Sequence, residues 1–407
     1  MTTYVGADWS ATKVVCAAAG PTGRPRSIGH AAANAKAVSQ LLERVRQRHA
    51  GTEIVVVLEA GNPLWAMLFH QAGVRVVVAD AKQVHHFAKA LASSGAKDDK
   101  RDARTLALFG RGMGGRTFEP AGPEFQQVKD LQRALAGVSE ELTKTLQRLR
   151  ASLQMQMPTV SKALPKLTTL WCLRFVEGAP TPWHAQQLSA AEVDTLCRRG
   201  SAESVAKLRT ALEGIDQRWH HQQTAEVQGA IVRQLVERIR MYLAQQKELD
   251  TLLADALQQL PSTAVLASVK GIGTKLKAAL TVHVLHSPLL HRDTAAVRLG
   301  ASPVFIGSAE DRRGRKKGSV RMRRAAHADA RRASFLLGRL ASQNLRWARA
   351  MYADATARGQ SSPTAYRRIA RSLLRIVTAL LKSGEAYNED LYIARLKANG
   401  VPWAADL

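Results

Sequence analysis

Apolar residues in the first third of the chain alternate between short continuous runs and longer, helically spaced stripes. The short runs cover 4–9, 14–19, 54–58 and 74–79, and the stripes cover 32–47, 64–71, 84–91 and 102–109. The run 54–58 (IVVVL) is almost entirely β-branched, which is typical of a strand buried on both faces. Because strands here are separated by helices, the pattern predicts an α/β sheet within 1–118.

The middle of the chain has a longer periodicity. Apolar residues recur at steps of three and four at Val128, Leu131, Leu135, Val138, Leu142, Leu146, Leu149 and Leu153. A second seam, interrupted by Gln246, runs through Val232, Leu235, Ile239, Tyr242, Leu249, Leu253 and Leu257. These seams predict two coiled-coil helices. They could pair as an antiparallel hairpin, pair with another copy, or lie in an ordinary helical bundle.

The remaining segments are less regular. A proline-containing insert at about 158–222 separates the two seams and has no periodicity from which to predict a fold. After Pro261 the chain becomes helical again, with one very basic interruption. We therefore expect three domains, at 1–118, 119–262 and 263–407.

The charge of the chain favours an anionic partner. The 407 residues include 59 Lys and Arg against 33 Asp and Glu, giving a formal net charge of +26. Such a chain gains affinity for a polyanion by releasing condensed counterions. DNA or RNA is therefore the leading partner, with a membrane surface or a ribosomal-type structural role as alternatives.

Hydropathy and cysteine content indicate the cellular environment in which the chain works. No apolar run approaches the ~18 residues that a membrane-spanning helix needs, and no signal peptide is recognisable at the start. The 3 cysteines have no paired metal-binding spacing, which disfavours a zinc site and a disulfide framework. A reducing cytoplasm fits this cysteine content.

Four acidic residues lie at the ends of predicted strands or at the start of a predicted helix in the α/β region. Asp8 and Glu59 end two strands, and Asp99 and Asp102 lie three residues apart at a helix start. Carboxylates placed in this way suit two-metal phosphoryl chemistry with Mg²⁺, a hard ion that prefers oxygen ligands. Each acid taken alone also fits a surface or helix-capping role. Neighbouring Asp98 leaves open which two acids of 97–102 would bind metal.

Two basic features follow Pro261. The segment 269–276 (VKGIGTKL) looks like a helix–hairpin–helix turn that contacts phosphate through Lys270, Gly271, Gly273 and Lys275, although a plain helix connector is the alternative. A basic run predicted to contact phosphates contains Arg312, Arg313, Arg315, Lys316, Lys317, Arg321, Arg323 and Arg324. Just upstream, Ser308 is either a loop serine or a nucleophile activated by a base or metal.

Taken together, these motifs resemble the DEDD insertion-sequence transposases related to the Piv invertases, the bridge-RNA-guided recombinases. The N-terminal matches are GADWS at 6–10, EA at 59–60 and KDDKRDA at 97–103. The C-terminal matches are GIG at 271–273, LGASP at 299–303, Ser308, RRA at 323–325 and GEAY at 384–387. They occur in the order found in the family.

The resemblance implies a RuvC-like, RNase H-type N-terminal domain, a coiled-coil domain and a mostly helical C-terminal transposase domain. It implies that Asp8, Glu59, Asp99 and Asp102 bind Mg²⁺ or Mn²⁺ and that Ser308 attacks a DNA phosphate to form a phosphoserine intermediate. It also implies target and donor DNA, a structured guide RNA, and a homodimer or homotetramer whose acidic and serine domains meet between subunits. The expected location is the bacterial cytoplasm, at the nucleoid during activity.

Three departures from the family pattern are visible. Ala309 stands where the family usually has glycine after the serine, Ala60-Gly61-Asn62 replaces the commoner sequence after the glutamate, and Asp98 replaces a threonine or serine. Two other functions remain open: a Mg²⁺ nuclease that hydrolyses branched DNA with water, and a non-enzymatic nucleic-acid binder.

Overall fold

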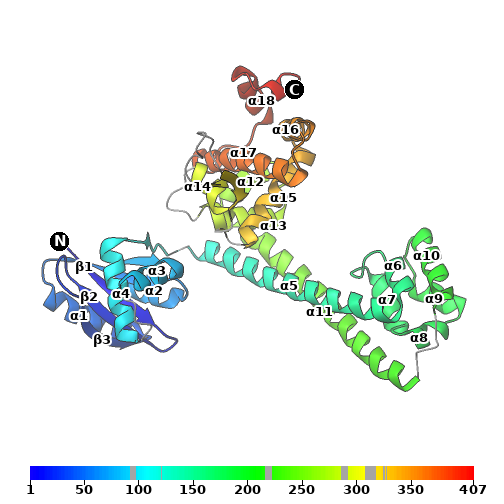
Figure 1. The fold of residues 1–407 in the computed structure, drawn as a ribbon, viewed down its shortest axis with the longest axis horizontal. Helices are drawn as coiled ribbons and strands as arrows, with labels where there is room; N and C mark the ends of the chain where they lie inside the picture. Colours follow the sequence, from blue (N-terminus) through cyan, green and yellow to red (C-terminus); the bar gives the residue numbers. More distant parts are fainter. Residues whose placement is uncertain are drawn as a thin grey trace. The chain divides into compact units, whose positions relative to one another are not determined.

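The computed structural model describes residues 1–91, 98–120, 122–215, 222–285, 292–307, 318–323, 326 and 328–407. The chain divides into two compact units, Met1–Ala121 and Gly122–Leu407 (Figure 1). In the described part of the chain, every helix is too short or too polar to cross a membrane. The division into three domains stays a prediction.

The first unit is built on a mixed sheet. Its elements are β1 (Thr2–Trp9), β2 (Lys13–Ala19), β3 (Arg26–Ala32), α1 (Ala35–Arg48), β4 (Glu53–Glu59), α2 (Pro63–Gln71), β5 (Arg75–Ala79), α3 (Ala81–Leu91), α4 (Asp99–Gly112) and β6 (Arg116–Thr117). The strand order is β3-β2-β1-β4-β5-β6. β1, β4 and β5 are parallel neighbours, whereas β2, β3 and β6 run antiparallel to theirs. The α/β prediction is confirmed.

Helices cover both faces of this sheet. Buried residues of α1 and α2 pack with alternate positions of β1 and β4, such as Ala7 and Leu58. On the other face, Leu106 and Phe109 of α4 pack on Val57 together with α3. Coverage on both sides explains why the whole apolar run of β4 is buried.

A glycine lets α4 approach the sheet closely. A Cβ on Gly6 of β1 would lie 2.0 Å from the carbonyl oxygen of Ala103 and 2.3 Å from the backbone nitrogen of Ala107. At the other end of the helix, a Cβ on Gly110 would lie 3.1 Å from Tyr4 Cδ1. α4 therefore runs antiparallel to β1, and its N-terminus lies over the C-terminal end of that strand.

Two strands and one helix start differ from the sequence prediction. β3 was not predicted, and it pairs with β2 across a bulge between Cys16 and Ala17 that breaks regular alternation. β6 is only 2 residues long. The helix predicted from position 32 begins at Ala35, where the Asn34 side chain accepts the Ala37 N–H.

The second unit is mostly helical. Its elements are α5 (Pro123–Gln156), α6 (Pro158–Ala163), α7 (Leu170–Gly178), α8 (Pro182–Gln186), α9 (Ala190–Leu196), α10 (Ala202–Glu213), α11 (Gln222–Gln258), α12 (Ser262–Ala267), α13 (Thr274–Leu280), η1 (Thr281–Leu285), α14 (Arg292–Arg298), β7 (Pro303–Gly307), β8 (Gly318–Met322), α15 (Ala328–Asn344), α16 (Arg346–Ala357), α17 (Ser362–Ser383), α18 (Glu389–Ala398) and η2 (Pro402–Ala404).

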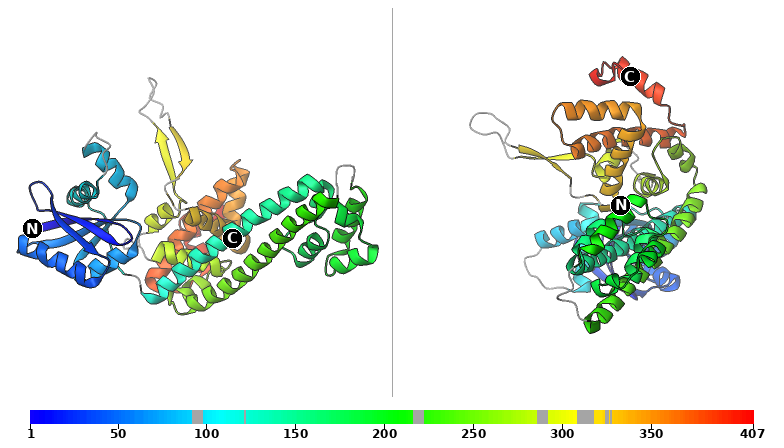
Figure 2. Two further views of the ribbon diagram at one scale, coloured as in Figure 1. Left: turned by 90° about the horizontal axis from the view of Figure 1, so that it is seen from below. Right: turned by 90° about the vertical axis from the view of Figure 1, so that its right-hand side faces the viewer.

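The two predicted seams pack against each other within the chain. α5 and α11 lie side by side as an antiparallel pair (Figure 2). Val128 shares a core cluster with Leu257, and Leu153 shares one with Val232. Of the pairings left open by the sequence, the chain adopts the antiparallel hairpin.

The polar interruption of the second seam has a partner. Gln246 donates from Nε2 to Ser139 Oγ at 2.8 Å, and Ser139 donates to the Leu135 carbonyl at 2.7 Å. A polar pair inside an apolar seam favours one register, because any slip would leave both groups unpaired.

The insert between the seams is a small helical cluster, α6 to α10, that packs on one end of the hairpin. Phe175 and Leu208 are fully buried there with Ile239 of α11. Glu177 accepts two hydrogen bonds from Arg240, each of 2.7 Å, which joins the insert to α11.

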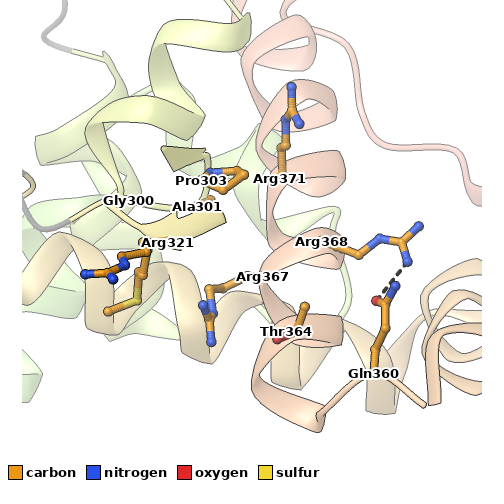
Figure 3. A pocket seen from close by; sticks show the side chains of 10 residues that line it. Gly300, Ala301, Pro303, Arg321, Gln360, Thr364, Arg367, Arg368 and Arg371 are labelled. Carbon is orange, nitrogen blue, oxygen red and sulfur yellow. Dashed lines mark hydrogen bonds between the residues drawn. The ribbon is translucent and has the colours of Figure 1, made fainter. Parts of the chain in front are cut away.

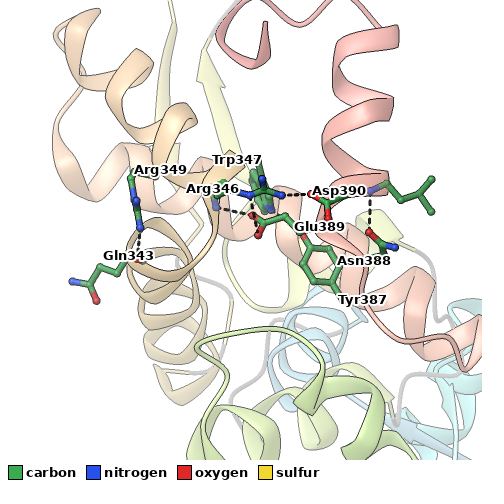
Figure 4. Close-up of polar contacts among 9 residues, drawn as sticks. Gln343, Arg346, Trp347, Arg349, Tyr387, Asn388, Glu389 and Asp390 are labelled. Atoms are coloured by element: carbon green, nitrogen blue, oxygen red, sulfur yellow. Dashed lines mark hydrogen bonds and ion pairs between the residues drawn. The ribbon is translucent and has the colours of Figure 1, made fainter. Parts of the chain in front are cut away.

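The C-terminal helices enclose a separate core around Trp347 and Leu374. Arg346 fastens α18 to α16: its backbone N–H donates to Glu389 at 2.6 Å, and its guanidinium pairs with Asp390 (Figure 4). The Trp347 indole donates to the Tyr387 hydroxyl at 2.8 Å. The mainly helical prediction is confirmed here, but the β7–β8 hairpin was not predicted.

We expect Gly6→Ala to weaken the first unit. The added methyl group would overlap α4 backbone atoms that cannot move aside, so the free energy of unfolding should fall by about 1–3 kcal/mol or more. Urea denaturation of the full chain measures this change. The control is Gly112→Ala, where no atom lies within 4 Å of a Cβ and where alanine should be neutral or slightly stabilising. Equal stabilities for the two variants would contradict the close contact.

Candidate active site

Two of the predicted acids are neighbours at the ends of parallel strands. The last paired residues of β1 and β4 are Ala7 and Leu58, and Asp8 and Glu59 come next on their strands. Adjacent strands lie ~4.8 Å apart, and paired positions of parallel strands point to the same face. Both acidic side chains are half-buried. They therefore share one end and one face of the sheet.

The other two acids lie at the start of α4. Because α4 runs antiparallel to β1 on the face occupied by Asp8, its first turn lies at the same end of the sheet. Asp99 is the first residue of the helix, and half-buried Asp102 directly precedes Ala103, the residue that contacts Gly6. The N-terminal end of the helix dipole also favours negative side chains there.

An ion pair places Asp99 near the strand ends. Lys13 Nζ lies 3.5 Å from Asp99 Oδ2, and Lys13 begins β2, close to the end of β1. Both side chains are more than half exposed, so the pair contributes little to stability. Asp98 is the N-cap residue of α4 but makes no capping hydrogen bond with its side chain.

Two tryptophans hold the ends of these strands. Trp9 donates from Nε1 to the Glu59 carbonyl at 3.0 Å, and a Cβ on Gly61 would lie 2.5 Å from the Trp9 ring. Buried Trp65 donates to the Ser10 carbonyl at 2.9 Å. Indole N–H groups thus bind the backbone carbonyl of Glu59 and that of Ser10, two residues after Asp8.

Cys16 lies on the strand beside Asp8. Burial, together with the negative charge of Asp8, raises the pKa of the Cys16 thiol well above its ordinary value of 9.0. Since the thiolate is the reactive form, Cys16 stays protonated and unreactive near neutral pH. Cys16 therefore packs in the core and is not a candidate nucleophile.

The acids share a location without forming a compact ligand cluster. Among the described residues, no group of three His, Cys, Asp or Glu side chains is arranged to hold a metal ion. The donor set is nevertheless purely carboxylate, which suits Mg²⁺ or Mn²⁺.

The second predicted site is only partly described. Ser308, Arg312, Arg313, Arg315, Lys316, Lys317 and Arg324 lie outside the described residues. The strands that flank this segment are described, and Gly307 of β7 pairs with Gly318 of β8. Arg321 is exposed at the end of β8, and Arg323 follows it half-buried.

Of the predicted helix–hairpin–helix residues, Lys270, Gly271 and Gly273 lie between α12 and α13, and Lys275 is the second residue of α13. Gly271 adopts a φ of +89° and packs against Asn344, where a Cβ would lie 2.9 Å from Nδ2. Gly273 precedes the first residue of α13, and Lys270 is exposed. Lys275 pairs with Asp250 of α11 at 3.1 Å. That ion pair links α11 to α13, so Lys275 already has a partner within the chain.

Comparison with known proteins identifies the acid-bearing unit. Residues 5–158 match the model of a family described as transposase, the DEDD transposases of the IS110 type. The N-terminal region of this chain is therefore similar to that family. A relative from Sinorhizobium fredii (strain NBRC 101917 / NGR234), named "Putative transposase y4uE", is 24% identical over 202 residues. That match covers 48% of this chain and 56% of the relative.

The match gives the four predicted acids more weight as candidate metal ligands. The matched region contains all four predicted acids, and the family that it matches suggests use of a divalent metal. The positioning roles of Trp9, Trp65 and Gly61 were missed by sequence reasoning. For Trp9 and Gly61 the sequence offers one indication, which is that each lies within two residues of a predicted acid: Trp9 follows Asp8, and Gly61 follows Glu59 by two positions.

We expect Trp9→Phe to loosen the Glu59 strand end. Phenylalanine fills most of the same space but cannot donate to the Glu59 carbonyl, so stability should fall by about 1 kcal/mol. If Glu59 binds metal, the Mg²⁺ concentration needed for half-maximal DNA cleavage should rise roughly 10-fold or more. Trp183→Phe makes the same change at a half-buried tryptophan of the second unit and should leave the Mg²⁺ requirement unchanged. An unaltered requirement in Trp9→Phe would refute the positioning role.

Proposed function

We propose that this protein is an RNA-guided DNA transposase that cuts and rejoins strands through a covalent phosphoserine intermediate. The observation that carries the proposal is the placement of Asp8, Glu59 and the first turn of α4 at one end of the sheet, inside the region that matches the transposase family. Mixed pairing around two parallel acid-bearing strands supports a RuvC-like, RNase H-type domain.

Asp8, Glu59, Asp99 and Asp102 would hold Mg²⁺ or Mn²⁺ in this proposal. The bound ions would supply charge stabilisation at the phosphate. Asp99 now pairs with Lys13, and that exposed pair is weak enough to exchange for a stronger ligand. A Lys13 released in this way could contact DNA phosphate.

The proposed strand exchange balances as two transesterifications. Ser308 Oγ attacks the phosphorus, the serine proton leaves, and the bond from phosphorus to one deoxyribose oxygen breaks with protonation of that oxygen. A hydroxyl group of a second strand then attacks the phosphoserine, and Ser308 regains its proton. The number of phosphodiester bonds is conserved, so no external energy source is required.

Partners follow from charge and from the family resemblance. A net charge of +26 supports binding to target DNA, donor DNA and a structured guide RNA whose base pairing chooses the sequence. The turn containing Lys270, Gly271 and Gly273 is a proposed helix–hairpin–helix contact to phosphate. We further propose a homodimer or homotetramer in the bacterial cytoplasm, in which the acids of one subunit meet Ser308 of another.

Replacing the acids tests the metal site. Asp8→Asn, Glu59→Gln, Asp99→Asn and Asp102→Asn should each lower Mg²⁺-dependent strand cleavage by about 10³-fold, because a lost ligand removes several kcal/mol of charge stabilisation. Cleavage of supercoiled plasmid carrying the element's ends, with its guide RNA, measures the effect. Asp98→Asn is the matched control and should keep its activity, since the Asp98 side chain makes no capping hydrogen bond. Full activity in Asp8→Asn would make the acids structural.

Replacing the serine tests the covalent step. Wild-type protein should form an adduct with end-labelled DNA that survives denaturation, and Ser308→Ala should abolish the adduct and strand joining together. Ser302→Ala, which changes a serine before β7, should retain both. If Ser308→Ala yields free cleaved ends at the wild-type rate, the protein is a nuclease that uses water.

A further inference from the structure

A groove of about 290 Å³ lies where α17 meets the base of the β7–β8 hairpin (Figure 3). Pro303 and Met322, the first cross-strand pair of the hairpin, line one side. The charged residues that line it are Arg321, Arg367, Arg368 and Arg371. None of the described lining residues is acidic.

The arginines of α17 are held close together by helix geometry. Arg367 and Arg371 are four residues apart and so lie on the same side of the helix, where like charges cost about 0.2–0.5 kcal/mol. The opposite side, with Ile369 and Leu373, is buried in the core and fixes which way the arginines face. An arrangement that costs free energy in the unbound protein is explained if an anion binds there.

The partners of these arginines leave their charge available. Arg367 Nε donates to the Pro363 carbonyl at 2.9 Å, and Arg368 donates to the Gln360 side chain at 2.9 Å, so both partners are neutral. Figure 3 shows the Arg368 side chain directed toward Gln360. Arg371 is exposed and makes no hydrogen bond or ion pair within the described part of the chain.

The lining indicates what kind of anion fits. Guanidinium groups bind phosphate oxygens in a bidentate manner. The described lining has no aromatic ring on which a base could stack, and its Gln360 side chain already bonds Arg368. The groove is therefore suited to the phosphodiester backbone and not to bases, and its contacts would be independent of sequence.

The groove lies at the start of β7, the strand that leads toward the proposed nucleophile. β7 leads from Pro303 in the groove to Gly307, the residue before Ser308. At about 3.4 Å per residue, that distance is ~14 Å. DNA carries one phosphate per ~3.4 Å of axis on each strand, so ~14 Å corresponds to about four nucleotides.

We propose that Arg367 and Arg371 bind DNA phosphates about four nucleotides from the Gly307 end of β7, the end that precedes Ser308 in the chain, with Arg321 on the hairpin side. They are positioning residues: the groove would fix where the strand lies relative to the hairpin. The position rests on the proposed function, whereas the phosphate site rests on the groove alone.

The salt dependence of DNA binding tests the groove. The double variant Arg367→Gln/Arg371→Gln should bind a 30-base-pair duplex roughly 10- to 60-fold more weakly at ~0.1 M salt, with a log–log salt slope shallower by about 1.8, since two phosphate contacts are lost. Arg367→Lys/Arg371→Lys keeps both charges and should restore the slope. Fluorescence anisotropy with EDTA present measures binding without any cleavage.

The control is a double variant that loses the same number of positive charges outside the groove. Arg395→Gln/Lys397→Gln removes two exposed charges from α18 and should leave the slope near that of the wild type. An equal loss in both double variants would show a general charge effect and overturn the site. A loss seen only with an RNA oligonucleotide of the same length would overturn the assignment to DNA.

Adduct formation separates this proposal from the proposed function. If the groove positions the strand, Arg367→Gln/Arg371→Gln should lower Ser308 adduct formation at saturating DNA or shift the cut site. If this double variant binds DNA normally and forms the adduct at the wild-type yield and position, the groove is not a phosphate site, and the proposed function is unaffected. No adduct from wild-type protein, with the salt slope still changed, would refute the phosphoserine mechanism and leave the phosphate site intact.

Discussion

Close backbone contact between α4 and β1 is the constraint on which the acidic site depends. Asp99 and Asp102 come from a helix, and Asp8 comes from a strand that lies more than ninety residues earlier in the chain. Only a residue without a side chain at position 6 lets the helix backbone reach the strand. The position of the helix then determines where its first turn lies. A similar contact recurs in the second unit, where a Cβ on Gly338 of α15 would lie 1.9 Å from the Tyr366 carbonyl of α17.

The main elements could be predicted because their causes are local. β-Branched residues alone indicate β4, and three- and four-residue spacing alone indicates α5 and α11. β3 was missed because Gly29, with a φ of +115°, and the facing bulge disturb its alternation. The β7–β8 hairpin was missed because its strands are short and adjoin the basic run, which dominates the local pattern.

The acids could be nominated from sequence, but their proximity could not be derived from it. Spacing in the chain gives no distance between Asp8 and Asp102, since that distance depends on the direction in which α4 crosses the sheet. The roles of Trp9 and Trp65 depend on hydrogen bonds to carbonyl groups some fifty residues away. The arginine groove depends on two elements separated by forty residues or more, Pro303 of the hairpin and Arg367 of the helix.

The antiparallel pairing of α5 with α11 affects which parts of the chain can vary in length during evolution. Because the two helices pair with each other from Val128 and Leu257 to Leu153 and Val232, the helical insert joins them at one end only. Lengthening, shortening or replacing the insert would leave the Gln246–Ser139 register and the opposite end of the hairpin in place. The tip of the hairpin is thus a site where related chains can differ in size while the rest of the second unit keeps its geometry.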